Sequence, residues 1–291
     1  MILVAAVSPI VEPLVADYRR TRDVTVLAPR LVPADLALRI WARGKTDRRY
    51  LGDFARRAAL DVWFAREVRR LRPETVIACS LGARCTFAAA KSIGARTMLV
   101  LDLPLFRALH RDLDRAATHW PERSFLRRFR APSWAIARQE AERVLADLVF
   151  VRGPYARSIC LADGIAPQRL SPLPARATVS IATPARPTHR IRLAGLAAAR
   201  HGIDTALEAA RIAGKTLVVR IGDGTEPSNL RQLGVATDDA PVDAVICPAV
   251  CETYAPELRI TGIPVIASPM ASLDGTGPDP YDASAFAAAF R

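Results

Sequence analysis

The sequence predicts an α/β protein made of two Rossmann-like lobes, each built on a parallel sheet. Two observations carry this prediction. Short apolar runs alternate with longer amphipathic segments along most of the 291 residues. Because these runs are continuously apolar rather than alternating, they are typical of strands that helices cover on both faces.

The first half of the chain shows this alternation most clearly. Polar residues, proline or glycine bound five runs that predict strands: Ile2–Val7, Val24–Ala28, Thr75–Cys79, Thr97–Leu101 and Leu148–Val151. Helical spacing of apolar residues predicts the helices between them: Leu51–Leu71, Ala83–Ile93, Leu103–Arg115 and Trp134–Ala146. Strands and helices that alternate in this way fold as a parallel sheet wrapped by helices.

A proline-rich segment divides the chain. Ser171–Thr188 contains prolines at positions 172, 174, 184 and 187 and has no helical period, which is typical of a linker. We therefore expect an N-terminal lobe at residues 1–174 and a shortened C-terminal lobe at residues 175–291. The second lobe is predicted to contain four strands and a helix: Ile191–Ala194, Thr216–Ile221, Ala244–Cys247, Pro264–Ala267 and Ile203–Ala213.

The cysteines argue against a disulfide framework. All five are scattered without a CxxC pair, and the four histidines do not cluster with them. This pattern is typical of reduced thiols in the cytoplasm and indicates no metal site. No apolar run is long enough to span a bilayer, and the first strand lacks the flanks of a signal peptide. We therefore expect a cytoplasmic protein without a bound cofactor or metal.

The charge is strongly positive, with a formal net charge of +12 and only three lysines among 41 basic residues. GC-rich coding produces such an arginine excess, and so does selection for an anionic partner such as a membrane surface, nucleic acid or phosphorylated substrate. The basic residues are densest between Arg43 and Arg130, so a functional charge would belong to the first lobe. No RNP-like motif, helix-turn-helix or zinc-finger spacing predicts a specific nucleic acid partner.

Loops that follow the predicted strands of the second lobe carry the candidate binding residues. Ligands of open parallel sheets lie at the carboxyl ends of the strands, where such loops meet helix N-termini. A cation at a helix start suits an anionic group, glycines allow a close backbone approach, and carboxylates accept hydrogen bonds from hydroxyls. The residues concerned are Gly195, Arg200, His201, Gly222, Gly224, Glu252 and Glu257.

The order of these features resembles the second lobe of the family-four glycosyltransferases of the GT-B fold. The resemblance covers roughly residues 138 to 270 and continues through Pro248 and the Gly262-Ile263-Pro264 turn into the last strand. It implies a GT-B fold and metal-independent transfer of a sugar, with retention, from a nucleotide-diphosphate donor to a glycan or lipid-linked acceptor.

The resemblance also implies roles for individual residues. Arg200 or His201 would stabilise the phosphates, Glu257 would bind the ribose hydroxyls, and Glu252 would face the donor sugar. On the acceptor side, the first-lobe loops and the following helix offer Asp102 and His110 as a base for the acceptor hydroxyl. The basic first lobe would suit peripheral contact with the anionic inner face of the membrane.

Departures from the family pattern leave a second function open. Three residues fewer separate Glu252 from Glu257 than in the family, Leu196 replaces the usual arginine, and His201 replaces the usual lysine. The alternative prediction is therefore a catalytically degenerate GT-B protein that acts as a nucleotide-binding or protein-interaction module.

Overall fold

A computed structural model describes residues 1–5, 11–27, 49–128, 130–174, 179–180, 184, 186–196, 198–220, 241–252, 260–272 and 274–290. Its contacts divide the chain into two compact units. The first comprises Met1–Phe106, Ala131–Arg152 and Cys160–Ala175, and the second comprises Arg107–Arg130, Gly153–Ile159 and Arg176–Arg291. The predicted lobe boundary at residue 175 is a single cut, whereas the units by contact are interleaved along the chain.

The first unit contains a six-stranded sheet in the order β2-β1-β3-β4-β5-β6, with every pair parallel. Its strands are β1 (Ile2–Ala5), β2 (Val24–Leu27), β3 (Thr75–Cys79), β4 (Arg96–Val100), β5 (Leu148–Val151) and β6 (Leu170–Pro172). All five predicted strands are therefore present, and β3 and β5 have the predicted bounds. The α/β class and the parallel sheet are confirmed.

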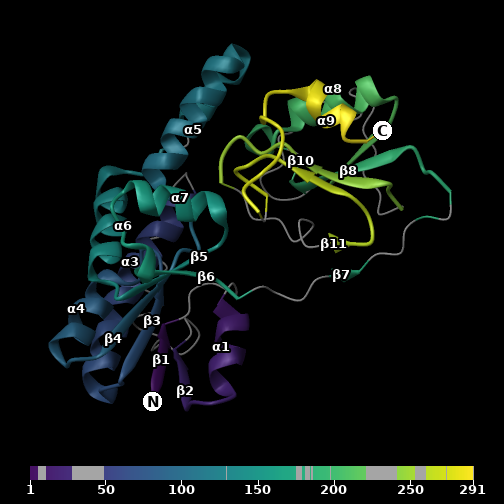
Figure 1. The fold of residues 1–291 in the computed structure, drawn as a ribbon. Helices are drawn as coiled ribbons and strands as arrows, with labels where there is room; N and C mark the ends of the chain where they lie inside the picture. Colours follow the sequence, from purple (N-terminus) through teal and green to yellow (C-terminus); the bar gives the residue numbers. More distant parts are fainter. Residues whose placement is uncertain are drawn as a thin grey trace. The chain divides into compact units, whose positions relative to one another are not determined.

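Helices cover both faces of this sheet, as the continuous apolar runs predict (Figure 1). On one side lies α1 (Glu12–Arg19), whose Leu14 and Val15 pack with Ile77 and Val100. On the other side lie the three helices α3 (Arg49–Leu71), α4 (Arg84–Ser92) and α6 (Ser133–Leu145). Most strand residues between these layers are buried, as expected for a sheet that is covered on both faces and whose successive side chains point to opposite faces.

The predicted linker contains short strands. Ser171 and Pro172 belong to β6, which pairs with β5 at the edge of the sheet. Proline is tolerated there because an edge strand can lack a donor on its outer side. Farther along, β7 (Val179–Ser180) pairs in parallel with β11 (Ile260–Thr261).

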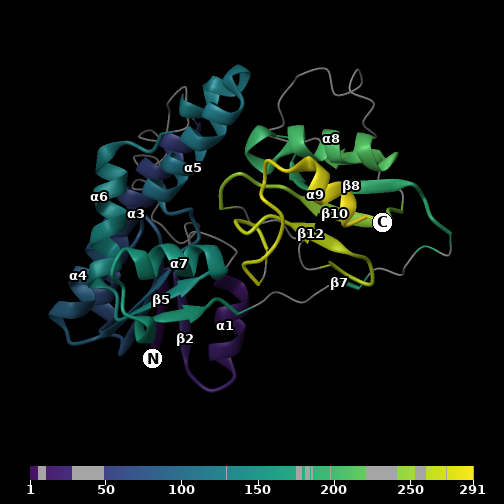
Figure 2. The same ribbon diagram turned by 45° about the horizontal axis from the view of Figure 1, so that its top comes forward.

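The second unit contains a four-stranded parallel sheet in the order β12-β10-β8-β9. Its strands are β8 (Arg190–Leu196), β9 (Thr216–Arg220), β10 (Ala244–Cys247) and β12 (Val265–Ala267). Helices α8 (Ile203–Ala213) and α9 (Ala283–Ala288) pack together on one face, where Phe286 is fully buried (Figure 2). The bounds of α8 match the prediction, whereas α9 was not predicted.

Both sheets have the same strand order. In each, the strand that comes first in the chain lies between the second and the third, and the fourth lies beyond the third. The strand order therefore reverses at the boundary between β1 and β3. The second strand is added on one side of β1, and the third and fourth are added on the other side. The same reversal occurs at the boundary between β8 and β10. Such a switch point, at the carboxyl ends of the strands, is where open α/β sheets bind ligands.

Two further helices each contain residues of both units. The predicted helix Leu103–Arg115 is observed as α5 (Phe106–His119), followed by the 3-10 helix η3 (Pro121–Arg128). Residues 107–130, which we call the α5–η3 arm, group with the second unit although they lie between β4 and β5 in the chain. The helix α7 (Pro154–Ala162) was not predicted and begins in the second unit.

Among the described helices, none has both the length and the apolar character that a bilayer crossing requires.

Candidate functional site

The switch point of the second sheet brings together two loops that the sequence marked as candidates. The first follows β8 and leads through Arg200 and His201 into α8, and the second follows β10 and runs from Pro248 to Glu252. The backbone N–H of Val250 donates to the carbonyl of Arg200 at 3.2 Å. The two loops are therefore joined directly, so Arg200, His201 and Glu252 belong to one region of the second unit.

Gly202 allows this close approach. It is the N-cap of α8 and has a φ of 77°, in the left-handed region that favours glycine. A Cβ atom at this position would lie 1.9 Å from the carbonyl oxygen of Pro248. A side chain would therefore separate the start of α8 from the loop after β10.

The predicted binding residues differ in their exposure. Arg200 is exposed, His201 is buried with 9% of its surface accessible, and Glu252 is half-buried. Gly195 lies within β8, near the carboxyl end of that strand. Gly222, Gly224 and Glu257 lie outside the described residues. The roles predicted for all of these residues remain predictions.

An acidic residue lies in the first turn of α8, where it would oppose the binding of an anion. Asp204 is, however, held by Arg123 of η3 through two hydrogen bonds of 2.6 and 3.2 Å. Both side chains are about four-fifths buried, at 22% and 23% exposure. A bidentate pair of this kind neutralises the carboxylate and fixes η3 against the start of α8.

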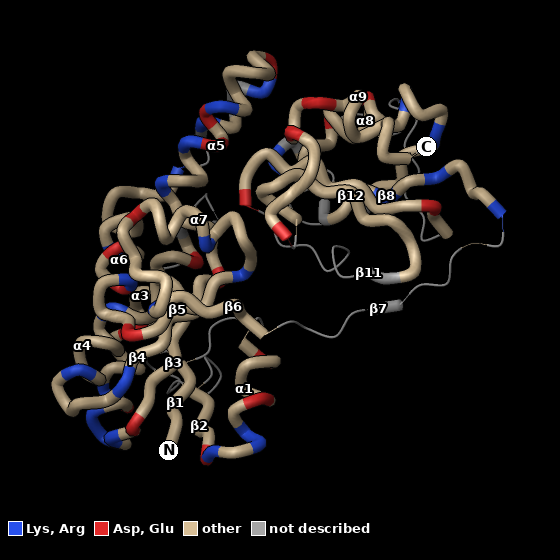
Figure 3. The backbone as a smooth tube through the Cα atoms, in the orientation of Figure 1, with Lys and Arg blue, Asp and Glu red and all other residues tan. Residues whose placement is uncertain are grey.

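The α5–η3 arm packs on the loop after β10. Leu113, Ala116 and Leu126 of the arm form one buried cluster with Val250 and Cys251. Basic and acidic residues are interspersed along α5 (Figure 3). The sequence placed this helix in the first lobe, because only the three-dimensional contacts reveal which sheet its apolar face covers.

The predicted acceptor-side residues belong to different units. His110 is half-buried on the arm, and burial, together with the charge of Arg130, lowers the pKa of its imidazole. Asp102 follows β4 in the first unit, and its side chain is 1% exposed. Its carboxylate accepts from Arg57 at 2.6 Å and from the backbone N–H of Ser80 at 3.0 Å.

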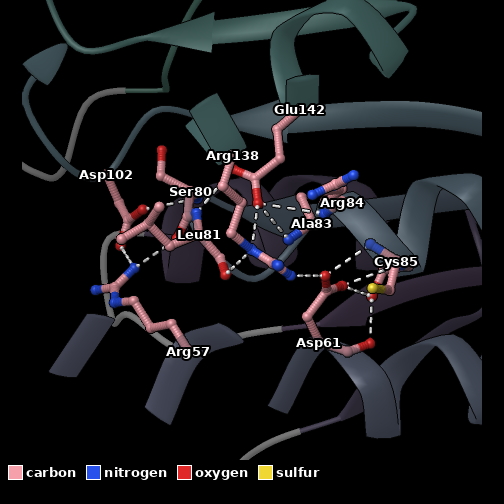
Figure 4. A network of polar contacts seen from close by, with 11 residues as sticks. Arg57, Asp61, Ser80, Leu81, Ala83, Arg84, Cys85, Asp102, Arg138 and Glu142 are labelled. Carbon is pink, nitrogen blue, oxygen red and sulfur yellow. Dashed lines mark hydrogen bonds and ion pairs between the residues drawn. The ribbon is translucent and has the colours of Figure 1, made fainter. Parts of the chain in front are cut away.

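A buried polar network lies at the carboxyl end of β3 in the first unit (Figure 4). Glu142 of α6 directs its carboxylate at the start of α4, where it accepts from the backbone N–H groups of Leu81, Ala83 and Arg84 at 2.8, 3.0 and 3.2 Å. A helix N-terminus is a ready site for an anion. Here the chain's own carboxylate occupies it.

A second carboxylate completes this network. Asp61 of α3 accepts from the backbone N–H groups of Cys85 and Thr86 at 2.6 and 2.8 Å and from the guanidinium of Arg138. Arg138 also donates to the carbonyl of Leu81 at 2.9 Å. Leu81 has a φ of 64°, which is uncommon for a residue with a side chain, and these contacts hold it there.

The described residues contain no group of three potential metal ligands.

Comparisons with known proteins address the fold. No protein-family model and no curated protein sequence matches the chain. Among solved structures, sucrose-phosphate synthase from Thermosynechococcus elongatus aligns with a TM-score of 0.55 at 14% identity, over 84% of this chain and 70% of its own. The glycotransferase of kitacinnamycin aligns with a TM-score of 0.50 at 14% identity, over 99% of this chain and 89% of its own. A UDP-GlcNAc 2-epimerase from Neisseria meningitidis aligns with a TM-score of 0.46 at 10% identity, over 99% and 89%.

The fold is of the GT-B type. The resemblance noted in the sequence is thereby confirmed at the level of the fold, with two α/β units built on parallel sheets of six and four strands. At 14% identity, the likeness to the GT-B neighbours concerns architecture alone.

Replacement of Gly202 tests the close approach at the switch point. Gly202→Ala is expected to lower the free energy of unfolding by at least about 3 kcal/mol, because it adds a backbone clash to an unfavourable φ. Gly214→Ala, at the other end of α8, is the matched control: its φ is 63°, but nothing lies within 4 Å of the added Cβ. Urea unfolding should show that Gly214→Ala lowers the free energy of unfolding by only about 1 kcal/mol. Equal losses would contradict the close approach.

The buried carboxylate of Glu142 predicts a pH dependence of stability. Burial raises its pKa to about 7 from an ordinary 4.5, against the opposing effect of the backbone N–H groups. Between these values the folded state binds the proton more tightly than the unfolded state, so stability falls as the pH rises. Thermal unfolding from pH 5 to pH 8 should show this loss, up to about 3 kcal/mol, in the wild type but not in Glu142→Gln.

Glu208→Gln is the control for this measurement. Arg211 lowers the pKa of the exposed Glu208 carboxyl, so its proton is lost below the tested range. The variant should keep the wild-type dependence. If the stability of the wild type changed with pH in the same way as that of Glu142→Gln, the raised pKa of Glu142 would be contradicted.

Proposed function

We propose that the protein is a glycosyltransferase that binds a nucleotide-diphosphate sugar at the switch point of the second sheet. The sugar would pass to a glycan or lipid-linked acceptor with retention and without a metal. The observation that carries this proposal is the junction of the α8 start with the loop from Pro248 to Glu252, in a chain with the GT-B fold.

The start of α8 suits the diphosphate. Its N-cap is Gly202, and among the described residues no side chain caps the helix. Its first-turn N–H groups and the positive end of its dipole therefore favour an anion. Arg200 is exposed beside them, while Arg123 neutralises Asp204. Because His201 is buried, we assign the principal cation to Arg200 rather than to the histidine.

The two glutamates would bind the rest of the donor. Glu252 follows Cys251, whose sulfur lies 4.0 Å from the carbonyl of Arg200, so its carboxylate starts from the same region. We propose that Glu252 accepts hydrogen bonds from the donor sugar. Glu257, outside the described residues, would do the same for the ribose hydroxyls.

For the acceptor, we propose His110 rather than Asp102 as the base. The lowered pKa of His110 keeps its imidazole neutral near pH 7, and the neutral form is the one that accepts a proton. Asp102 is engaged by Arg57 and by the N–H of Ser80, which supports a structural role in the loop after β3. Peripheral contact of the basic residues with an anionic membrane would accompany a lipid-linked acceptor.

Replacement of Arg200 tests the phosphate assignment. Arg200→Ala should weaken binding of a nucleoside diphosphate at least tenfold, roughly the contribution of a charge-assisted hydrogen bond. Isothermal titration with UDP, GDP and ADP measures this. Arg211→Ala removes an exposed arginine from the far end of the same helix, where it pairs with Glu208, and should leave the affinity unchanged. Equal affinities for the wild type and Arg200→Ala would refute the site.

A catalytically degenerate nucleotide-binding or interaction module is the second candidate. It is favoured by the burial of His201 and by the packing of the arm on Val250 and Cys251, directly before Glu252. Incubation with a panel of nucleotide sugars separates the two. Slow release of free nucleotide supports the transferase, whereas tight binding without release supports the degenerate module.

A further inference from the structure

Three segments of the second unit bring an acid and two phenols together beside the buried cluster that contains Leu113 and Cys251. Asp112 comes from α5, Tyr155 from the start of α7, and Tyr281 from the turn before α9. Tyr281 packs on the cluster that contains Leu113 and Cys251. The charge of Asp112 acts on the Tyr281 hydroxyl. None of these residues was a candidate in the sequence.

Asp112 is a buried acid with spare capacity to accept hydrogen bonds. Its side chain is 7% exposed, and its Oδ2 accepts from the hydroxyl of Tyr155 at 2.5 Å. Its Oδ1 lies 3.6 Å from Nε of Arg111, too far for a good hydrogen bond. A carboxylate can accept about four hydrogen bonds. Burial raises the pKa of Asp112, and the Tyr155 hydroxyl and Arg111 oppose that shift.

Tyr281 presents a fixed hydroxyl donor. Arg115 lies over its ring at 5.1 Å, and the rings of His119 and Trp120 contact it at 4.4 and 5.1 Å. The hydroxyl is buried and has no hydrogen-bond partner among the described residues. Burial raises its pKa to about 12, so it keeps its proton at neutral pH. A buried hydroxyl without a partner is costly and rare in folded proteins.

We propose that Asp112 and Tyr281 form a subsite that binds hydroxyl groups of a sugar ring. A carboxylate that accepts and a phenol that donates match hydroxyls, which do both. The carboxylate disfavours a phosphate, and Arg111 and Arg115 beside the pair disfavour a cation. Tyr155 acts through Asp112 as a positioning residue. The subsite rests on the proposed function, because Cys251 links it to Arg200 and Glu252. The ring belongs either to the donor or to the acceptor.

Tyr281→Phe removes only the hydroxyl and is the principal test. Titration calorimetry compares UDP, GDP and ADP with their sugar conjugates, then methyl glycosides at saturating nucleotide. We expect Tyr281→Phe to weaken sugar recognition about tenfold while leaving the affinity for the nucleotide unchanged. If Tyr281→Phe removes the extra affinity that a sugar conjugate has over its free nucleotide, the ring belongs to the donor. If it weakens the affinity for methyl glycosides, the ring belongs to the acceptor.

Three further variants test whether the effect of Tyr281→Phe is specific to the subsite. Tyr18→Phe is the matched control, since its hydroxyl donates to the sulfur of Met98 in the first unit, and it should change no affinity. Asp112→Asn should weaken sugar recognition as Tyr281→Phe does. Tyr155→Phe should weaken it less, because Asp112 keeps its charge.

Each outcome bears on one proposal. A Tyr281→Phe protein with a raised melting temperature and wild-type affinity for every conjugate and glycoside overturns the subsite and leaves the donor site intact. Failure of every nucleotide and conjugate to bind overturns the proposed function. In that case the binding of methyl glycosides alone, measured by tryptophan fluorescence, decides the subsite. Binding that is weakened in Tyr281→Phe supports it. No binding at methyl glycoside concentrations on the order of millimolar, in large excess over the protein, overturns it.

Discussion

The arrangement of the second unit depends on one contact between backbones, the approach of Gly202 to Pro248. Because the residue has no Cβ, the first turn of α8 can rest against the carbonyl of Pro248. The hydrogen bond from Val250 to Arg200 then ties the two loops, and Ser268 donates its hydroxyl to the carbonyl of Ala249 from the next strand end. Three strand ends are thereby held at one edge, and every candidate residue described there takes its place from this framework.

The two units differ in how the helix start beside the switch point is used: α4 follows β3 in the first unit, and α8 follows β8 in the second. In the first, the N-terminus of α4 is filled by Glu142, with Asp61 and Arg138 around it. The donors of that helix are therefore already used within the fold. In the second, the N-terminus of α8 begins with a glycine, and the nearby Asp204 is turned toward Arg123. Among the described residues, a carboxylate of the chain therefore caps the helix start of α4, whereas no side chain caps that of α8.

Most of the framework could be predicted because its signals are local. Thr75–Cys79, Leu148–Val151 and Ala244–Cys247 are short apolar runs with sharp polar bounds, and Ile203–Ala213 lies between two glycines. The helix α9 was missed because six residues give no clear period, although Asp282 caps it through Ala285. The strand β6 was missed because its proline indicates a linker unless the strand lies at an edge.

The site could be predicted only where the loop sequences carry the signal. Arg200, His201 and Glu252 follow strands, so topology brings them together. Asp112, Tyr155 and Tyr281 are separated by long stretches of chain, and no spacing rule joins them. Asp102 illustrates the opposite case: its position after a strand suggested chemistry, whereas its contacts with Arg57 and Ser80 bury it.

The interleaving of the units limits how the protein can be divided. The arm leaves the first sheet after β4 and returns before β5, yet its apolar side covers Val250 and Cys251 of the other unit. A fragment that starts at the proline-rich segment would leave this apolar surface, and the ring of Tyr281, open to water. The complementary N-terminal fragment would carry the α5–η3 arm without Val250 and Cys251, against which its leucines pack. A cut at the proline-rich segment would therefore divide the second unit rather than separate the two units from each other.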